Sequence, residues 1–221
     1  MKKILLILLA VCLCFGMSAC GDTDANNGDV TRSRTDNSVV PTTTTYHSDY
    51  HPSELFNATN HVQIDFEDYG TVTLELYGEL APITVENFLN LAESGFYDGL
   101  TIHRIYNGYL IQGGDPEGNG TGGSDETIKG EFAENGVEND LKHVRGVISM
   151  ARSQDYDSAS SQFFIMSNDE SAFDGNYAAF GYVTEGMEVI DQIIANTPVA
   201  DANGTVLAFD QPTISKITVI D

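Results

Sequence analysis

Short runs in which apolar and polar residues alternate are the feature that most constrains the fold of this chain. Every second residue is apolar in 62–66 and again in 72–76, on either side of the turn sequence Asp68-Tyr69-Gly70. This period of two is that of a strand with one buried face, and two such runs joined by a short turn predict a β-hairpin. Further short strands are expected at 100–106, 109–113, 146–151, 162–167, 178–183 and 213–220.

Two segments have a helical period instead. The first begins around Pro82 and stops at Gly95, and we expect Thr84 near its N-cap. The second is 186–195, where apolar residues form a stripe. Many short strands with two helices favour a mainly β domain over residues 61–221, in which the helices cap the open ends of a closed antiparallel sheet.

The N-terminal part has the pattern of a secreted protein. Lys2 and Lys3 precede an apolar stretch, and small residues then lead to Cys20. Residues 1–19 are therefore predicted to be a signal peptide, in which Met17-Ser18-Ala19-Cys20 resembles the lipobox of bacterial lipoproteins. The sequence has three cysteines, and Cys20 is the one that would remain after processing. We expect Cys20 to carry lipid; an ordinary signal-peptidase site beside a chance cysteine is the alternative.

Residues 20–60 are rich in Asp, Asn, Ser and Thr, a composition that predicts a disordered polar tether. Removing residues 1–19 would leave eight Lys and Arg against 33 Asp and Glu, a formal net charge of −25. Nucleic acid and anionic lipid headgroups would repel so acidic a protein. The expected location is extracytoplasmic, with the domain held at the cell membrane by its N-terminal lipid and without a nucleic-acid partner.

Polar side chains able to hydrogen-bond an amide lie among large apolar residues in 103–115 and 161–165. Arg104 is unusual in a domain with few cations; an ion pair with one of the many carboxylates is the alternative to a functional role. His103 is expected to be a hydrogen-bonded core histidine. Residues 118–123 match G-x-G-x-x-G, but no apolar helical pattern follows, so we interpret them as a glycine loop. No clustered metal ligands and no obvious carboxylate pair are present, and neither a metal nor a cofactor is expected.

From about residue 62 onwards the chain resembles the cyclophilin family of peptidyl-prolyl isomerases. The resemblance rests on segments at 84–88 (TVENF), 95–99 (GFYDG), 103–105 (HRI), 112–115 (QGGD), 120–123 (GTGG), 149–151 (SMA), 161–165 (SQFFI), 174–175 (DG) and 180–181 (FG). It implies a closed eight-stranded antiparallel β-barrel capped by two α-helices.

By motif, the resemblance implies that Arg104 is catalytic. It also implies a substrate site made of Tyr109, Leu110, Gln112, Ala151, Arg152, Gln162, Phe164, Phe173 and Tyr177. Three positions depart from the family: Tyr109 stands where Phe is usual, Tyr177 replaces a common His, and Ala172 lies where cyclosporin-sensitive members carry Trp. Residues 153–160 form a segment one residue longer than in eukaryotic members.

The function expected from this resemblance is isomerisation of X-Pro bonds in secreted or cell-envelope proteins, by a monomer that needs no cofactor. An arginine could stabilise the twisted amide by hydrogen bonding to the prolyl nitrogen, while apolar walls exclude water. A non-catalytic proline-peptide-binding module or chaperone on the same fold is the alternative. A carbohydrate-binding β-protein ranks last, because the chain contains no Trp.

Overall fold

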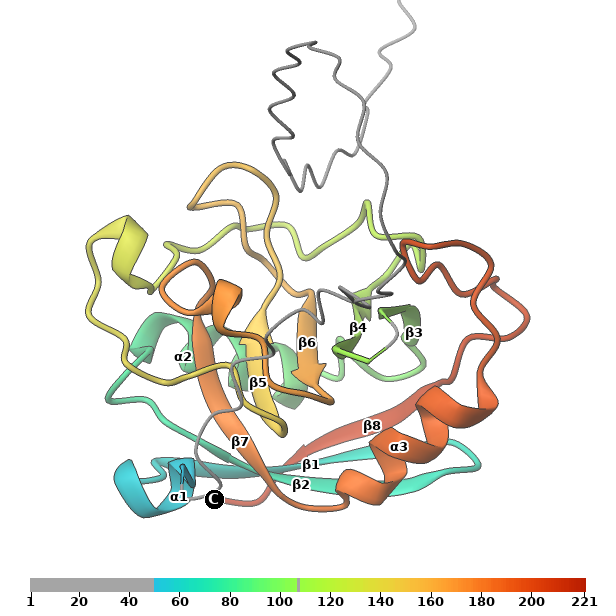
Figure 1. Ribbon diagram of the computed structural model, residues 1–221, viewed down its shortest axis with the longest axis horizontal. Coiled ribbons are helices and arrows are strands. Elements are labelled where there is room, and N and C mark those ends of the chain that lie inside the picture. The colour runs from blue at the N-terminus through green and yellow to red at the C-terminus, as the bar shows by residue number, and fades with distance from the viewer. Residues whose placement is uncertain (1–49, 107) are drawn as a thin grey trace, which may run out of the picture. The chain divides into compact units, whose positions relative to one another are not determined.

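The alternating segments form one antiparallel sheet in the computed structural model, which describes residues 50–106 and 108–221. Its strands are β1 (Asn60–Phe66), β2 (Gly70–Leu76), β3 (Thr101–Tyr106), β4 (Leu110–Asp115), β5 (Val147–Met150), β6 (Phe163–Met166), β7 (Ala179–Glu185) and β8 (Ile214–Val219). The strand order is β3-β4-β6-β5-β7-β2-β1-β8 (Figure 1). The predicted hairpin is β1–β2, in which Val62 faces Leu74.

The sheet curls into a half-barrel whose edge strands are β3 and β8. Among the described residues no continuous ladder joins these edges, and they meet through the bridge Thr101–Thr213. The Ile102 and Ile214 amides donate to the Pro212 and Leu100 carbonyls at 2.9 and 2.7 Å. The expectation of eight antiparallel strands is thus confirmed, whereas full closure of the barrel stays a prediction.

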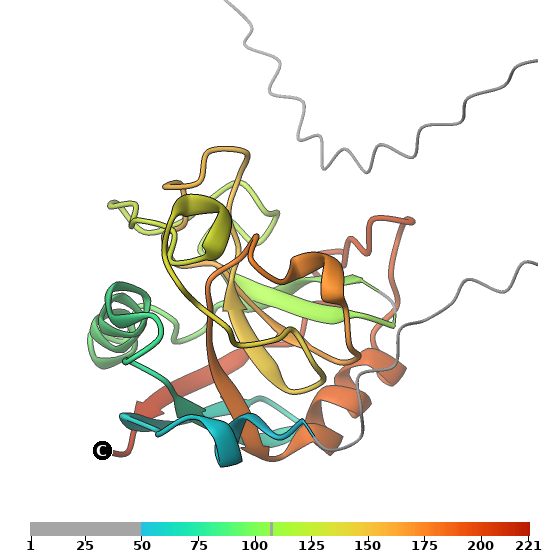
Figure 2. The same ribbon diagram turned by 60° about the vertical axis from the view of Figure 1, so that its left-hand side comes forward.

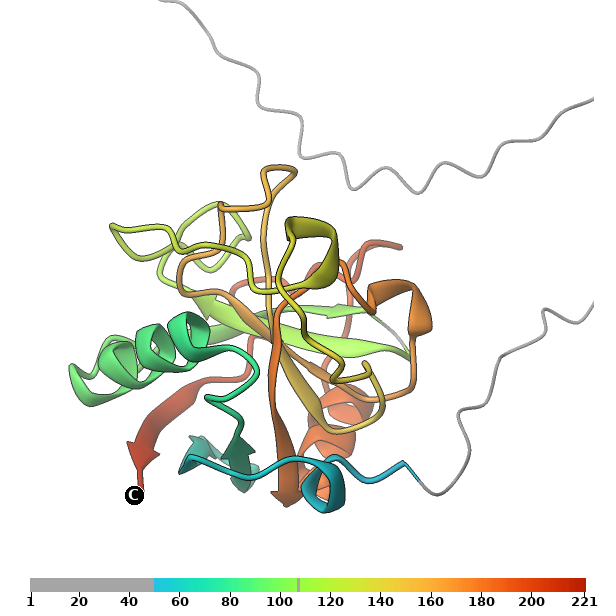
Figure 3. The same cartoon turned by 90° about the vertical axis from the view of Figure 1, so that its left-hand side faces the viewer.

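The two longer helices are α2 (Pro82–Glu93) and α3 (Met187–Asn196), and they lie at opposite ends of the curled sheet (Figures 2 and 3). Helix α2 packs on β8 and α3 packs on β2. Thr84 is buried in the first turn of α2, three residues after the N-cap Ala81, so it lies near the N-cap as expected, but its side chain does not cap the helix. The buried Glu131 carboxylate instead accepts the Ile83 and Thr84 amides, at 3.1 and 2.8 Å, and the Thr84 hydroxyl, at 2.7 Å.

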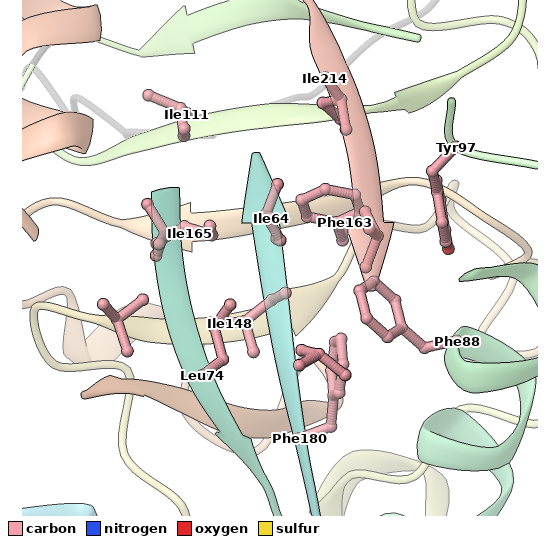
Figure 4. Close-up of a cluster of buried hydrophobic side chains, with 14 of the residues drawn as sticks. Ile64, Leu74, Phe88, Tyr97, Ile111, Ile148, Phe163, Ile165, Phe180 and Ile214 are labelled. Carbon is pink, nitrogen blue, oxygen red and sulfur yellow. The ribbon is translucent and has the colours of Figure 1, made fainter. Parts of the chain in front are cut away.

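The core lies inside the curl of the sheet. Phe88 reaches it from α2, and its ring lies 5.2–5.6 Å from those of Tyr97, Phe163 and Phe180 (Figure 4). Alternation along the strands then decides which residues remain for the outer face. On β4 Ile111 points into the core, whereas Leu110 belongs to a second apolar cluster together with Phe164 of β6.

Residues 50–59 lie within the segment expected to be a tether, but they pack against the domain. They include the short helix α1 (Pro52–Leu55), and the Phe56 ring lies 5.7 Å from that of Tyr77. The Tyr50 hydroxyl accepts a hydrogen bond from the Lys142 amide at 3.1 Å. Cys20 and the expected signal peptide fall outside the described residues, among which no helix is both long and apolar enough to cross a bilayer.

Candidate active site

One row of residues crosses the outer face of four neighbouring strands. Arg104 on β3 is paired with Gln112 on β4, Gln112 with Phe164 on β6, and Phe164 with Ser149 on β5. Facing residues in adjacent strands have side chains on the same face of the sheet. The sheet register therefore brings the predicted catalytic arginine beside two of the predicted substrate-binding residues, although about sixty residues of chain separate Arg104 from Phe164.

A directed chain of hydrogen bonds runs away from Arg104. Its Nη1 donates to Gln112 Oε1 at 3.1 Å, Gln112 Nε2 donates to Gln162 Oε1 at 2.9 Å, and Gln162 Nε2 donates to the Gly122 carbonyl at 2.8 Å. Each amide is thereby held in one orientation. The glycine loop at 118–123 thus supports the site through Gly122. In the described part of the chain no α-helix begins at its last glycine, so the loop lacks the context of a dinucleotide-binding motif.

Arg104 makes no ion pair with a carboxylate among the described residues. Within this part of the chain the ion-pair alternative is therefore wrong. Besides Nη1, its Nε donates to the Asn203 carbonyl at 2.8 Å, and the guanidinium lies 5.2 Å from the centre of the Tyr106 ring. Burial lowers the pKa of Arg104, and the charges of Tyr106, Tyr177 and Asp201 oppose this shift. Nη2 makes no hydrogen bond with the described residues and remains available as a donor.

Aromatic rings form a wall next to this polar chain. The rings of Phe164, Phe173 and Tyr177 lie 5.2–5.8 Å apart and meet edge to face. Leu110 is buried in the same cluster, and Ala151 packs at its margin. Edge-to-face packing holds such rings at defined angles, so the cluster forms an apolar surface in which the ring orientations are fixed.

A buried histidine lies behind the wall. The His143 ring is stacked on Phe164 at 6.0 Å and lies edge-on to Phe173 at 5.8 Å. Its Nδ1 donates to the Asp174 carboxylate at 3.1 Å, since an ionised carboxylate can only accept, and Nε2 then accepts from the Ser149 hydroxyl at 3.0 Å. Burial lowers the pKa of His143, against the opposing effect of Asp174. A neutral ring with a fixed tautomer therefore supports the wall.

His103 differs from the expectation of a hydrogen-bonded core histidine. It is buried, but neither ring nitrogen has a partner among the described residues. Burial lowers the pKa of His103 to about 4, with Arg104 lowering it further and Asp115 opposing the shift. The ring is neutral at physiological pH, which places no second positive charge beside Arg104.

Two predicted site residues lie at the ends of the wall. Tyr109 is one of the more exposed aromatic residues, and its ring stacks on that of Tyr106 with 5.4 Å between the ring centres. Arg104, Tyr106 and Tyr109 thus lie in one row. Arg152 lies 4.9–5.0 Å from the ring centres of Phe132, Tyr156 and Tyr177. Its Nε and Nη2 both donate to the Asn176 carbonyl, at 3.0 and 2.8 Å. Arg152 is thus held in an aromatic cage that includes one ring of the wall.

Sequence reasoning missed three contributors to the site: His143 as a support, Tyr106 as the surface under the guanidinium, and Asn203, whose carbonyl accepts from Arg104. Tyr106 follows Arg104 by two residues and so shares its face of β3, a signal that was present in the sequence. The other two come from distant segments, and only the folded chain brings them close.

Comparisons with known proteins point to one family. Residues 61–219 match the family described as cyclophilin type peptidyl-prolyl cis-trans isomerase/CLD. The chain is 45% identical over 126 residues to a peptidyl-prolyl cis-trans isomerase of Helicobacter pylori, which covers 56% of this chain and 75% of that protein. It is 46% identical over 122 residues to peptidyl-prolyl cis-trans isomerase B of Bacillus subtilis, covering 55% and 82%.

The fold also resembles a solved cyclophilin-type isomerase of Cryptosporidium parvum, with a TM-score of 0.64 and 30% identity over 73% of this chain and 98% of that one. A second crystal structure of that protein, determined in the presence of the dipeptide Ala-Pro, has the same TM-score, 31% identity, and coverage of 73% and 99%.

Proposed function

The chain belongs to the cyclophilin-type family of peptidyl-prolyl cis-trans isomerases, and we propose that it turns X-Pro bonds by hydrogen bonding from Arg104 to the prolyl nitrogen. Rotation about such a bond takes tens to hundreds of seconds unaided, because it must overcome amide resonance. In the twisted amide the nitrogen becomes pyramidal and exposes a lone pair. A donor held where this lone pair forms stabilises the transition state more than either planar isomer.

The free Nη2 of Arg104 is the observation that carries this proposal. Two other nitrogens of the guanidinium are anchored, on Gln112 and Asn203, so the remaining edge has a fixed direction and needs no reorganisation when the amide twists. The wall formed by Leu110, Phe164 and the rings beside it offers an apolar surface for the proline ring. It would also remove water from the amide, which favours the less polar twisted form.

The remaining polar groups are suited to holding the peptide on either side of the proline. Gln112 uses one amide hydrogen on Gln162 and keeps a second, which could donate to a substrate carbonyl. The Ala151 amide is engaged with the Gln162 carbonyl at 2.9 Å, so its own carbonyl is the group we assign to the substrate. The crystal structure of the C. parvum relative in the presence of the dipeptide Ala-Pro supports a proline-containing peptide as the ligand.

The test is turnover of an Ala-X-Pro peptide by the purified chain, followed by protease-coupled cleavage or by exchange between the cis and trans NMR signals. We expect catalysed isomerisation. The alternative, a module that holds proline peptides or acts as a chaperone without turnover, would give peptide-induced shifts at unchanged exchange rates. Phe164→Ala is the matched variant for binding, since it removes a ring of the wall and leaves Arg104 in place.

We further propose that the enzyme is a lipid-anchored, monomeric folding factor outside the cytoplasm. The anchor and the location rest on the signal-peptide pattern of residues 1–19 and on the lipobox-like sequence that ends at Cys20. Cys20→Ala should move the protein from the membrane fraction to the medium without changing the isomerase activity of the domain. Equal membrane retention of the two proteins would contradict the anchor, and a sedimentation mass of twice the monomer would contradict the oligomeric state.

We also propose that the half-barrel closes at its β3–β8 edge through the bonds around Thr101 and Thr213. Hydrogen exchange at the Ile102 and Ile214 amides measures this directly. Protection comparable with that of the central strands supports closure, and exchange at the rate of free peptide would oppose it.

A further inference from the structure

The loop between α3 and β8 lies against the outer edge of β3, the strand that carries Arg104 (Figure 1). The Ile105 amide donates to the Gly204 carbonyl at 2.8 Å, and the Val206 amide donates to the His103 carbonyl at 3.0 Å. These two bonds bracket Arg104, which is bridged to Thr205. The same stretch of loop places the Asn203 carbonyl 2.8 Å from Arg104 Nε.

One carboxylate, that of Asp201, accepts three hydrogen bonds within this loop. Asp201 Oδ1 accepts the Asn203 and Thr205 amides at 2.9 and 3.1 Å, and Oδ2 accepts the Thr205 hydroxyl at 2.9 Å. These bonds lower the pKa of Asp201, and the bond from the Thr205 amide has the largest effect. The carboxylate is therefore charged at neutral pH. Residues 201–203 are exposed, so the carboxylate holds the turn together with two backbone bonds, from the Gly204 amide to the Asp201 carbonyl at 3.1 Å and from the Ala200 amide to the Thr205 carbonyl at 2.7 Å.

Gly204 completes the turn. Its φ is +82°, and a Cβ at this position would overlap the Ile105 carbonyl oxygen. The turn therefore approaches the backbone of β3 more closely than any other residue would allow. This contact holds the turn against β3, and the bond from the Asn203 amide to the Asp201 carboxylate fixes the residue before Gly204 within it.

We propose that Asp201 is a positioning residue for the reaction, which acts by fixing the carbonyl that orients the Arg104 guanidinium. The proposal rests on the role proposed for Arg104 above. With Nε held by Asn203 and Nη1 by Gln112, the plane of the guanidinium is fixed at two points and Nη2 has one direction. Without the Asn203 anchor the group can rotate about the Gln112 bond, and a misdirected donor stabilises the transition state less.

The first test compares Asp201→Ala with Asp201→Asn in the full chain. Asp201→Ala should lower kcat about tenfold with little change in KM, because the turn contacts the guanidinium and not the proline wall. Asp201→Asn keeps an oxygen for both amides and should retain most of the activity. Asp210→Ala is the matched control: it removes the same charge from the same loop, and its carboxylate accepts no hydrogen bond from the described residues.

The second test is a double-mutant cycle with Arg104→Ala, measured at high enzyme concentration. If Asp201 acts through Arg104, adding Asp201→Ala to Arg104→Ala should lower the residual activity no further. If Asp201→Ala lowers activity by the same factor in the wild type and in Arg104→Ala, the inference is overturned and the effect is a general structural one. This conclusion does not depend on the melting temperatures of the variants. Wild-type kcat in Asp201→Ala would also overturn it. Normal activity of Arg104→Ala alone would instead refute the proposed function, so the two failures are distinguishable.

Discussion

Acid should destabilise this protein through His103, and the structure gives the size of the effect. The ring is buried with neither nitrogen bonded, and burial lowers its pKa from 6.5 to about 4. Between these two values the unfolded chain binds the proton more tightly than the folded chain does. The free energy of unfolding therefore falls as the pH drops below 6.5, and the loss is complete below about 4.

One pKa unit corresponds to about 1.4 kcal/mol, so the full loss from His103 is about 3 kcal/mol, of which about 2 kcal/mol has occurred at pH 5. For a domain of this size that corresponds to a decrease in Tm of about 4–8 °C. His143, whose pKa burial also lowers, adds a loss of the same sign. Other groups also take up protons in acid, so the contribution of His103 must be measured as a difference.

His103→Leu supplies this difference, since it fills the site with an apolar side chain that binds no proton. Urea unfolding of both proteins at pH 7 and pH 5 should give a loss about 2 kcal/mol smaller in the variant. The same loss in the two proteins would show that His103 takes up its proton as easily in the fold as in the unfolded chain, and would refute the reasoning.

Three further outcomes are expected. Glu131→Ala should lower the stability by about 3 kcal/mol, because it removes a helix cap and leaves the buried Thr84 hydroxyl without its acceptor; thermal melting beside the exposed control Glu134→Ala tests this. His143→Phe keeps the ring but leaves the buried Ser149 hydroxyl unpaired, so it should cost about 1–3 kcal/mol in urea unfolding, and wild-type stability would mean that the ring only fills space. Cyclosporin should inhibit about tenfold to a hundredfold more weakly than in members that have Trp at the Ala172 position, and Ala172→Trp should strengthen inhibition; tight inhibition of the wild type would contradict this.

The strands and helices could be predicted because their signals are local. The period of two in 62–66 and 72–76 matches β1 and β2, and the helical stripe at 186–195 matches α3 within one residue at each end. The cap of α2 could not be predicted in this way. Thr84 has the residue type of a cap, but the carboxylate that takes this role is 47 residues away at Glu131.

In the site, too, local motifs could be recognised in the sequence, whereas contacts between distant segments could not. Motif resemblance predicted Arg104, Gln112 and Phe164 as site residues, and the sheet register places these three residues in one row. The partners that set the direction of each group come from distant loops, as the Asn203 carbonyl and the cage around Arg152 do. Packing of 50–59 on the domain was likewise hidden, because the polar composition of the segment does not reveal that Phe56 meets Tyr77.

The role of Arg104 is the central claim, and the most direct measurement is the isomerisation rate of Arg104→Ala and Arg104→Lys against wild type. Loss of one preorganised donor should lower kcat about 10²–10³-fold with a smaller change in KM. Lysine should restore little, since a compact ammonium cannot reach Gln112, Asn203 and the prolyl nitrogen together. Near-normal turnover in a folded Arg104→Ala variant, with the melting temperature of the wild type, would contradict the account.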